Sequence, residues 1–351
     1  MIVIFYFFIV LLLFVFPKSK AIQFIATIIL FLLFAFNYDN ADRDVYVDRY
    51  YFYYEYSSMT EPLYTLLMSF LSIHHLGVQS LMHIVALVFI GTIIVVVSKF
   101  SKNFGIALGG YMIACFFMDV VQVRFTLSLV FVYIGLWYHT QIKNELLAAV
   151  IYMIFILLSA SVHASSFIFS LFLLARIKDK NKVITYTMIL SCMLAIVVVY
   201  FAYIDSSLDF FQAKISHVGE MAEDRYNIKT ILRRIFLLFL IIALFFFSYY
   251  LSPLQTKQIK GETFLMNYMR NINILSICFI PLLFFSADFH RLFYAIYIIN
   301  LAIISRWVNK KNRFIINIAV VLTSFILLYA LSLAGNKKYV FDAIFYKNLI
   351  L

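Results

Sequence analysis

The amino-acid sequence predicts an all-α integral membrane protein, a polytopic bundle of about 12 transmembrane helices with one short re-entrant or interfacial helix. Of the 351 residues 65% are hydrophobic and 13% are charged, and the mean hydropathy is +0.97. A soluble domain is about 45–50% apolar. The apolar residues also form successive runs separated by short connections, and every second connection is rich in Lys and Arg.

The spans follow from comparing these runs with the roughly 20 residues that cross about 30 Å of hydrocarbon. The shorter runs, especially 164–176 and 290–305, either borrow flanking residues or line a water-filled cavity. Residues 62–73 contain about a dozen apolar-rich positions, which favours a re-entrant or interfacial helix. The predicted spans are 2–16, 21–36, 77–98, 104–121, 125–141, 145–160, 164–176, 183–204, 231–251, 271–287, 290–305 and 314–334.

The basic loops set the predicted orientation, because cytoplasmic loops carry an excess of Lys and Arg. Assigning these loops to the cytoplasm places both termini outside, provided that residues 62–73 do not cross completely. Nearly every unusual polar residue then lies on the external side, where we expect one functional site that opens to the exterior. The cytoplasmic groups are Lys18/Lys20, Lys99/Lys102, Lys143, Arg176/Lys178/Lys180/Lys182, Lys257/Lys260/Arg270 and Arg306/Lys310/Lys311/Arg313.

Composition and charge narrow the function classes. The net charge of +11 reflects membrane topology here, so no nucleic-acid partner is expected. The three cysteines lie inside apolar runs, and no disulfide or zinc spacing is present. The first run lacks a basic start and a small-residue cleavage site, so it is interpreted as a retained span. With no visible repeat, residues 1–351 are predicted to form one transmembrane domain.

An acidic and aromatic external loop, residues 37–61, is the most unusual stretch. Its segment Asp39–Glu61 holds six carboxylates, two arginines and seven aromatic residues. Carboxylates accept hydrogen bonds from sugar hydroxyls and Tyr rings cover sugar C–H faces, so the mixture suits carbohydrate. The alternative is an interfacial aromatic belt, because the tyrosines at 46, 50, 53 and 54 follow helical spacing.

The carboxylates of this loop are candidates for acid–base chemistry. Asp42-Arg43-Asp44 has the DxD form that binds a divalent cation with a nucleotide sugar, but the loop faces away from the cytoplasm, and short matches arise by chance. We therefore predict no metal or other cofactor. A general base that takes a proton from an acceptor hydroxyl is the better interpretation, against that of a solvated acidic loop.

Two polar positions interrupt the apolar runs that follow. Arg124, with Gln122, lies at a span boundary and could hold a diphosphate bidentately, or pair with Asp119, or extend to the interface. His163 stands alone in SASVHASSFIF. It is either a structural histidine or an acid–base group, because its ordinary pKa is near neutral.

The later external segments carry further candidates. His290 and Arg291 follow Asp288 at the start of a predicted span. The amphipathic loop 205–230 could lie across the membrane surface as a lid. Arg233 and Arg234 begin the next span on the outside, against the basic-inside rule, and would attract either substrate phosphates or lipid headgroups.

Taken together, these residues resemble the bacterial surface-polysaccharide polymerases, the O-antigen, capsule and exopolysaccharide class, and in particular its EpsG-like branch. The resemblance covers chain length, span count and five landmarks in order. Two departures are the missing Gly before the first Asp, where Asn40-Ala41 stands, and a C-terminal tail, 339–351, without a family signature. The landmarks are Asp44-Val45-Tyr46, Glu61-Pro62-Leu63-Tyr64, Gln122-Val123-Arg124, His163-Ala164-Ser165-Ser166 and Arg291.

This resemblance implies a membrane glycosyltransferase of GT-C type in the bacterial cytoplasmic membrane. It would move a glycan from undecaprenyl diphosphate onto a hydroxyl of another lipid-linked repeat unit, on the external face and without a nucleotide sugar. A flippase and a chain-length regulator are possible partners. The assignment that follows is Asp44, Glu61 or His163 as base; Arg124 and Arg291, with Arg233 or Arg234, on diphosphate; and Gln122, Asp42, Tyr46 and His290 as further substrate contacts.

Three other functions are compared with the pattern of polar residues in the sequence. A lipid-linked oligosaccharide flippase or other transporter would be expected to show repeated halves and a midplane site, whereas the polar groups here gather on one side. A membrane acyltransferase would need its His and Arg nearer the cytoplasmic side. A glycan ligase uses nearly the same chemistry, and the sequence does not separate it from a polymerase.

Overall fold

The computed structural model describes residues 2–55, 61–203, 260–285, 287–308, 312–329, 338 and 340–350. These residues are almost entirely helical, and they contain no β-strand, only an isolated antiparallel bridge between Asn37 and Asn348. The all-α class predicted from the sequence is thereby confirmed. The described chain divides into two compact units, residues 1–170 with 297–351, and residues 171–296.

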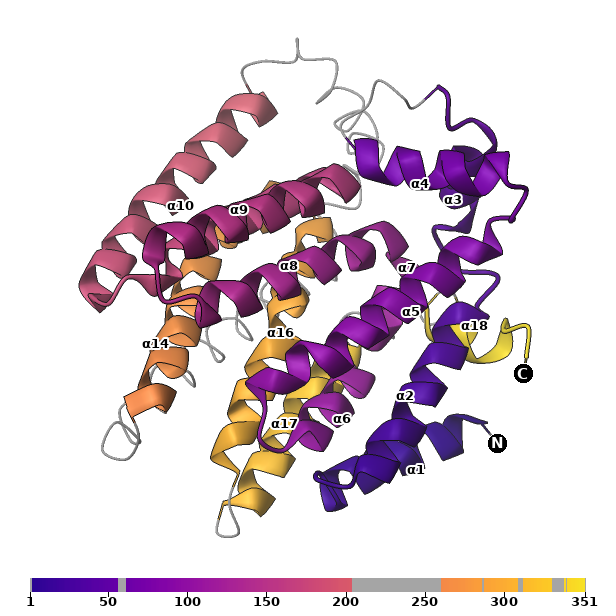
Figure 1. Cartoon of the computed structure of the whole chain (residues 1–351), viewed down its shortest axis with the longest axis horizontal. Coiled ribbons are helices and arrows are strands. Elements are labelled where there is room, and N and C mark those ends of the chain that lie inside the picture. The colour runs from indigo at the N-terminus through magenta and orange to yellow at the C-terminus, as the bar shows by residue number, and fades with distance from the viewer. Residues whose placement is uncertain are drawn as a thin grey trace. The chain divides into compact units, whose positions relative to one another are not determined.

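The first unit contains most of the helices in chain order (Figure 1). Two elements cross the limits of the units: the 3₁₀ segment Ala164–Arg176 and α16 (Arg291–Ile304). The helices wholly within the first unit are α1 (Ile2–Val15), α2 (Lys20–Ala35), α3 (Arg43–Tyr51), α4 (Pro62–Ile73), α5 (Gln79–Val95), α6 (Phe104–Ala114), α7 (Phe116–Val121), α8 (Val123–Gln141), α9 (Glu145–Val162), α17 (Arg313–Leu328) and α18 (Phe341–Tyr346), with short 3₁₀ turns at Val97–Phe100 and Ser305–Trp307.

The second unit is built from α10 (Lys180–Tyr203), α14 (Lys260–Leu275) and α15 (Ile280–Phe285), with 3₁₀ turns at Ser276–Phe279 and Ala287–His290. The buried Asn271 side chain donates to the carbonyls of Ala175 (2.9 Å) and Ile177 (2.8 Å), which ties α14 to the turn before α10. These two hydrogen bonds satisfy carbonyls that the end of a helical segment leaves without a helical partner.

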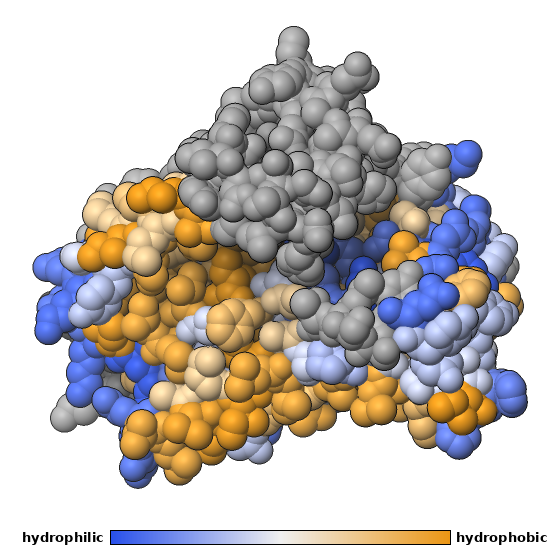
Figure 2. Space-filling model, turned by 90° about the horizontal axis from the view of Figure 1, so that it is seen from above, coloured by the Kyte–Doolittle hydropathy of each residue, from blue (hydrophilic) through white to orange (hydrophobic). Residues whose placement is uncertain are grey.

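By length and composition, three of the described helices could cross a membrane: Gln79–Phe100, Glu145–Val162 and Lys180–Val197. Large apolar side chains are exposed along them, such as Leu87 on α5 and Leu146 on α9, and much of the described surface in Figure 2 is hydrophobic. An apolar exterior of this kind is compatible with a helical membrane protein. The predicted span 231–251 and the predicted lid 205–230 lie outside the described residues.

The structure departs from the predicted spans where helices break. The predicted span 104–121 divides at Cys115 into α6 and α7, and a second break at Gln122 separates α7 from α8. No Pro or Gly stands at either break. The side chain of Thr126 donates to the carbonyl of Asp119 at 2.8 Å, a carbonyl that a continuous helix would pair with the Val123 amide. At the second break a side-chain donor therefore takes the place of a backbone donor.

Close packing of the first unit fixes the helices that carry polar groups. In Figure 1, α8 and α9 run side by side, and the Ser159 hydroxyl of α9 donates to the Ser128 carbonyl of α8 at 2.9 Å. Gly105 lets α6 approach the connection between α1 and α2, because a Cβ there would lie 2.7 Å from the Cα of Pro17. Between α4 and α5, Gly77 takes a positive φ of 74° and donates its amide to the Tyr50 hydroxyl at 3.2 Å.

The C-terminal clasp, residues 341–350, holds the beginning of the loop that leads to α3. The amide of Tyr38 donates to the Lys347 carbonyl (3.3 Å), and the amide of Leu349 donates to the Phe36 carbonyl (2.9 Å). The wholly buried Asn37 side chain donates to the Ala343 carbonyl at 3.1 Å. The C-terminal residues are thus joined to residues 36–38, where the acidic and aromatic loop begins.

Candidate functional site

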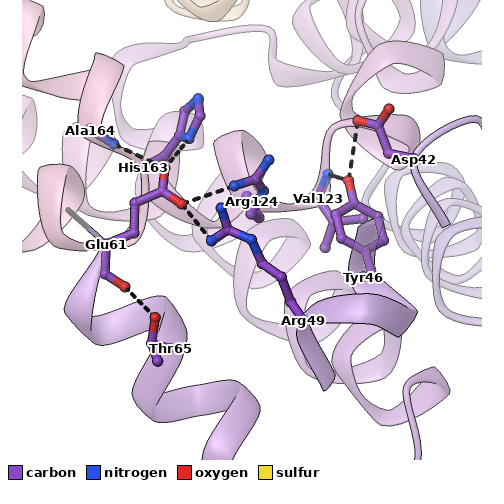
Figure 3. A network of polar contacts seen from close by, with 9 residues as sticks. All are labelled: Asp42, Tyr46, Arg49, Glu61, Thr65, Val123, Arg124, His163 and Ala164. Carbon is purple, nitrogen blue, oxygen red and sulfur yellow. Dashed lines mark hydrogen bonds and ion pairs between the residues drawn. The ribbon is translucent and has the colours of Figure 1, made fainter. Parts of the chain in front are cut away.

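A buried ionic cluster is centred on Glu61, the residue that precedes α4 (Figure 3). Its Oε2 atom accepts hydrogen bonds from Nη1 of Arg49 and Nη1 of Arg124, each at 2.9 Å. Its Oε1 atom lies 2.8 Å from Nδ1 of His163 and 3.4 Å from the amide of Ala164. One carboxylate therefore gathers four donors. We call Glu61, Arg49, Arg124 and His163 the Glu61 cluster.

Four separate elements contribute to this cluster, and each places its residue at a helix end or in a short helix. Arg49 lies in the last turn of α3, and Arg124 is the second residue of α8, just after the break at Gln122. His163 ends α9 with an extended backbone (φ −148°, ψ 108°), and the 3₁₀ segment follows it. Helix ends are the natural positions for polar groups in an apolar bundle, because backbone donors and acceptors there need partners.

The cluster is largely shielded from solvent. The exposed fraction of the side chain is 9% for Glu61 and His163, 15% for Arg49 and 24% for Arg124. Burial by itself would raise the pKa of Glu61, but the hydrogen bond to His163 and the charges of Arg124, His163 and Arg49 outweigh it and hold that pKa well below its ordinary value. Glu61 is therefore an ionised acceptor.

An ionised Glu61 determines which nitrogen of His163 carries the proton. Because a carboxylate only accepts hydrogen bonds, Nδ1 of His163 must be the donor at 2.8 Å. In neutral His163 the proton is then on Nδ1, and Nε2, a buried atom, is the nitrogen without a proton. The Glu61–His163 pair has the arrangement of the carboxylate and imidazole in hydrolase triads, where the acid orients the base.

The aromatic ring of Tyr64 supports both guanidinium groups. The Cζ atoms of Arg49 and Arg124 lie 5.6 Å and 5.7 Å from its ring centroid. Aromatic faces attract cations, so the ring and the Glu61 carboxylate together offset the repulsion between two arginines held close to each other. The Tyr64 hydroxyl is fully buried and has no hydrogen-bond partner among the described residues.

Arg124 thus pairs with Glu61, and Asp119, the partner considered from the sequence, has other contacts. The Tyr111 hydroxyl donates to Oδ2 of Asp119 at 2.9 Å, and the hydroxyl of Thr126 lies 3.5 Å from Oδ1. Gln122 occupies the break itself, with φ −94° and ψ 57°. The break turns α8 so that its first turn, with Arg124, meets the N-terminal end of α4.

The acidic and aromatic loop separates into buried and exposed residues. Tyr46 and Tyr50 are buried, whereas Tyr51 and Tyr54 are 62% and 59% exposed. Asp42 precedes α3, and its Oδ2 atom lies 3.5 Å from the Tyr46 hydroxyl. The loop's aromatic residues therefore divide into some that pack inside the first unit and others that lie at its surface.

Asp44 lies exposed in the first turn of α3. Within the described part of the chain, no ion pair or hydrogen bond joins its side chain to Glu61, Arg124 or His163. His290 and Arg291 belong to the second unit, at the start of α16. Arg233 and Arg234 lie outside the described residues. Within the described ranges, no group of three or more His, Cys, Asp or Glu side chains is arranged as metal ligands.

Two members of the site were not identified from the sequence as site residues, namely Arg49 and Tyr64. A signal for Arg49 was present, because it lies three residues after Tyr46 and one before Tyr50, on the face of α3 that both buried tyrosines share. Tyr64 stands within the Glu61-Pro62-Leu63-Tyr64 landmark, three residues after Glu61. Nothing in the sequence distinguishes its ring from the many other tyrosines.

Comparison with known proteins gives one result. The family model described as EpsG family matches residues 20–347, which includes every residue of the Glu61 cluster. No curated protein and no solved structure matches the chain.

Proposed function

Because this chain belongs to the EpsG family, we propose that it is a membrane glycosyltransferase that joins lipid-diphosphate-linked oligosaccharide repeat units into a polysaccharide. The donor is a glycan on undecaprenyl diphosphate, and the acceptor is a sugar hydroxyl of a second lipid-linked unit. The enzyme acts as a single domain of about 12 spans and GT-C type in the bacterial cytoplasmic membrane, on its external face. A flippase would supply the units and a chain-length regulator would limit the product.

The observation that carries this proposal is the meeting of Arg49, Arg124 and His163 at one buried carboxylate. Each guanidinium group uses Nη1 to reach Glu61, and each has five N–H donors in total. The donors of Arg124 that do not reach Glu61 suit the oxygens of a diphosphate, which binds Arg in a bidentate manner. His290, Arg291, Arg233 and Arg234 stay candidates on the sequence alone.

The reaction forms a bond between the acceptor oxygen and the anomeric carbon and breaks the bond from that carbon to the phosphate oxygen. The leaving diphosphate keeps the electron pair, and Arg124 and Arg49 stabilise the charge that develops on it. Nε2 of His163 accepts the acceptor's proton, while Glu61 orients the imidazole and stabilises its charged form. Of the three candidate bases, His163 fits best, because Glu61 is already bound by cations and Asp44 lies outside the cluster.

The test is the lipid-linked glycan pattern of cells that lack the gene, resolved on gels. We expect single repeat units on lipid. Loss of all external glycan would instead identify a flippase, and full-length polymer retained on the lipid carrier would identify a ligase.

Complementation with variants then tests the site. Arg124→Ala is expected to leave single units, as the deletion does. Arg43→Ala is the matched control, because this arginine lies on α3 outside the Glu61 cluster and is expected to restore polymer. Full-length polymer with Arg124→Ala at normal protein level would contradict the proposed site.

A further inference from the structure

The break between α7 and α8 leaves two backbone groups that a continuous helix would have paired. The carbonyl of Val121 and the amide of Val123 flank Gln122, where the backbone leaves the helical region. In a continuous helix the Val123 amide would donate to the Asp119 carbonyl, but the Thr126 hydroxyl already donates to that carbonyl at 2.8 Å. Both groups are buried with their residues, so each needs another partner.

The Tyr46 hydroxyl is the partner of both groups. It donates to the Val121 carbonyl at 2.7 Å and accepts from the Val123 amide at 3.0 Å. The Tyr46 side chain is only 2% exposed, so water does not compete for these bonds. In Figure 3 its ring reaches from α3 to the start of α8, beside the residue that follows Val123, namely Arg124.

Tyr46 and Arg49 belong to the same short helix. They are three residues apart, so they share one face of α3. Arg49 reaches Glu61 directly, whereas Tyr46 holds the backbone amide next to Arg124. One rigid turn of α3 therefore sets the position of both guanidinium groups relative to each other.

From this geometry we infer that Tyr46 is a positioning residue, which holds the first turn of α8 so that Arg124 and Arg49 meet the same anion. The inference rests on the proposed function, in which these two arginines bind the donor diphosphate. It assigns Tyr46 a role through Arg124 and not a direct contact with the glycan, because its ring is buried and its hydroxyl is bonded to backbone.

The test compares Tyr46→Phe with Tyr50→Phe in purified protein in proteoliposomes. Tyr50 is the matched control: it is a buried tyrosine of α3, and its hydroxyl accepts one backbone amide, that of Gly77 at 3.2 Å, away from α8. For Tyr46→Phe we expect the donor KM to rise roughly 10- to 100-fold, because a displacement of about 1 Å has effects of this size. The acceptor KM is expected to stay unchanged, as are both constants in Tyr50→Phe.

A double variant separates positioning from a general loss of structure. If Tyr46 acts through Arg124, then Tyr46→Phe causes no further loss of polyprenyl diphosphate binding in the Arg124→Ala background. Additive effects in the double variant, or equal rises in donor and acceptor KM, would overturn the inference. So would a Tyr46→Phe protein with a wild-type donor KM.

Two readouts that need no turnover keep this test independent of the proposed function. Hydrogen exchange at residues 121–126 is expected to accelerate in Tyr46→Phe and not in Tyr50→Phe. Binding of polyprenyl diphosphate without sugar is expected to weaken in the same variant alone. Wild-type protein that binds this probe without any glycan transfer would refute the polymerase activity and leave the role of Tyr46 standing. Unchanged exchange and binding in Tyr46→Phe would refute the positioning role.

Discussion

Oε1 of Glu61 and Nδ1 of His163 lie 2.8 Å apart, although 102 residues separate them in the chain. The contact joins the start of a 12-residue helix to the end of an 18-residue helix. It combines a carboxylate, kept ionised by its hydrogen bond to His163 and by two arginines, with the imidazole that is the base in the proposed reaction. The catalytic part of the proposal depends on this contact.

Replacing His163 by Gln is expected to lower kcat by about 10²- to 10⁴-fold, the usual contribution of a general base, with a nearly unchanged donor KM. The acidic limb of the pH–rate profile, which reports protonation of the base, should disappear from the residual activity. The measurement is steady-state transfer in proteoliposomes across pH. His75→Gln is the control, since His75 is exposed after α4. An acidic limb that persists in His163→Gln would assign the base elsewhere.

Glu61→Gln removes the carboxylate that Arg49 and Arg124 share, so two partly buried guanidinium groups lose the charge of this common partner. Removing one partner from such a buried ion pair costs about 3–5 kcal/mol, so the thermal midpoint in detergent should fall clearly. Glu61→Asp keeps the charge on a shorter side chain and is expected to lose less. A Glu61→Gln protein as stable as the wild type would show that the cluster does not support the fold.

A comparison of wild-type protein with Glu61→Gln across pH tests whether Glu61 is ionised. Because the pKa of Glu61 in the folded chain lies below its ordinary value of 4.5, the carboxylate stabilises the fold fully above that value. Its contribution is lost as the pH falls from there through the folded pKa. The difference in thermal midpoint between wild type and Glu61→Gln should therefore not shrink from pH 8 to about pH 6, and it should shrink only below about pH 4.5. A difference that already shrinks near pH 6 would mean that Glu61 is not held ionised.

Arg49→Lys and Arg49→Ala are expected to differ in their effect on the donor. Lys keeps the positive charge over the Tyr64 ring but lacks the planar fork that binds Glu61 and phosphate at once. We expect a donor KM about 10-fold above wild type for Arg49→Lys, and a larger rise with partial loss of kcat for Arg49→Ala. Arg43→Ala on the same helix should leave the donor KM unchanged. A wild-type donor KM in Arg49→Ala would remove Arg49 from the diphosphate site.

Most residues of the Glu61 cluster could be identified from the sequence, but their contacts with one another could not. Glu61, Arg124 and His163 each stand out because a charged or titratable group interrupts or borders an apolar run, which is costly unless it is used. Their contacts span 63 and 102 residues, and periodicity carries no information on such distances. Arg49 was harder to single out, because it lies in a loop with many other charged residues, and only its spacing from Tyr46 and Tyr50 distinguished it.

The helix breaks could not be predicted from the hydrophobic pattern of the sequence. The sequence predicted a continuous span over 104–121, and the apolar residues on both sides of Cys115 support that prediction equally well. At the Gln122 break, backbone groups of α7 and α8 bond instead to the Tyr46 hydroxyl from α3 and to the Thr126 side chain. The EpsG-like resemblance, by contrast, needed only landmarks in order, and the family match confirms it.

The C-terminal clasp is expected to stabilise the loop before α3 through buried amides and not through its ion pair. Asn37→Ala leaves the Asn40 side chain, which donates to Asn37 Oδ1 at 3.2 Å, without this buried acceptor, and removes one of the two donors to the Ala343 carbonyl, which keeps the Lys347 amide. An unsatisfied buried group costs about 1–3 kcal/mol, so the thermal midpoint should fall. Lys347→Gln removes the ion pair between Lys347 and Asp39, whose side chains are 43% and 44% exposed, respectively. The loss of such an exposed pair should change the free energy of unfolding by less than about 1 kcal/mol. A larger loss in Lys347→Gln than in Asn37→Ala would reverse this order and show that charge holds the clasp.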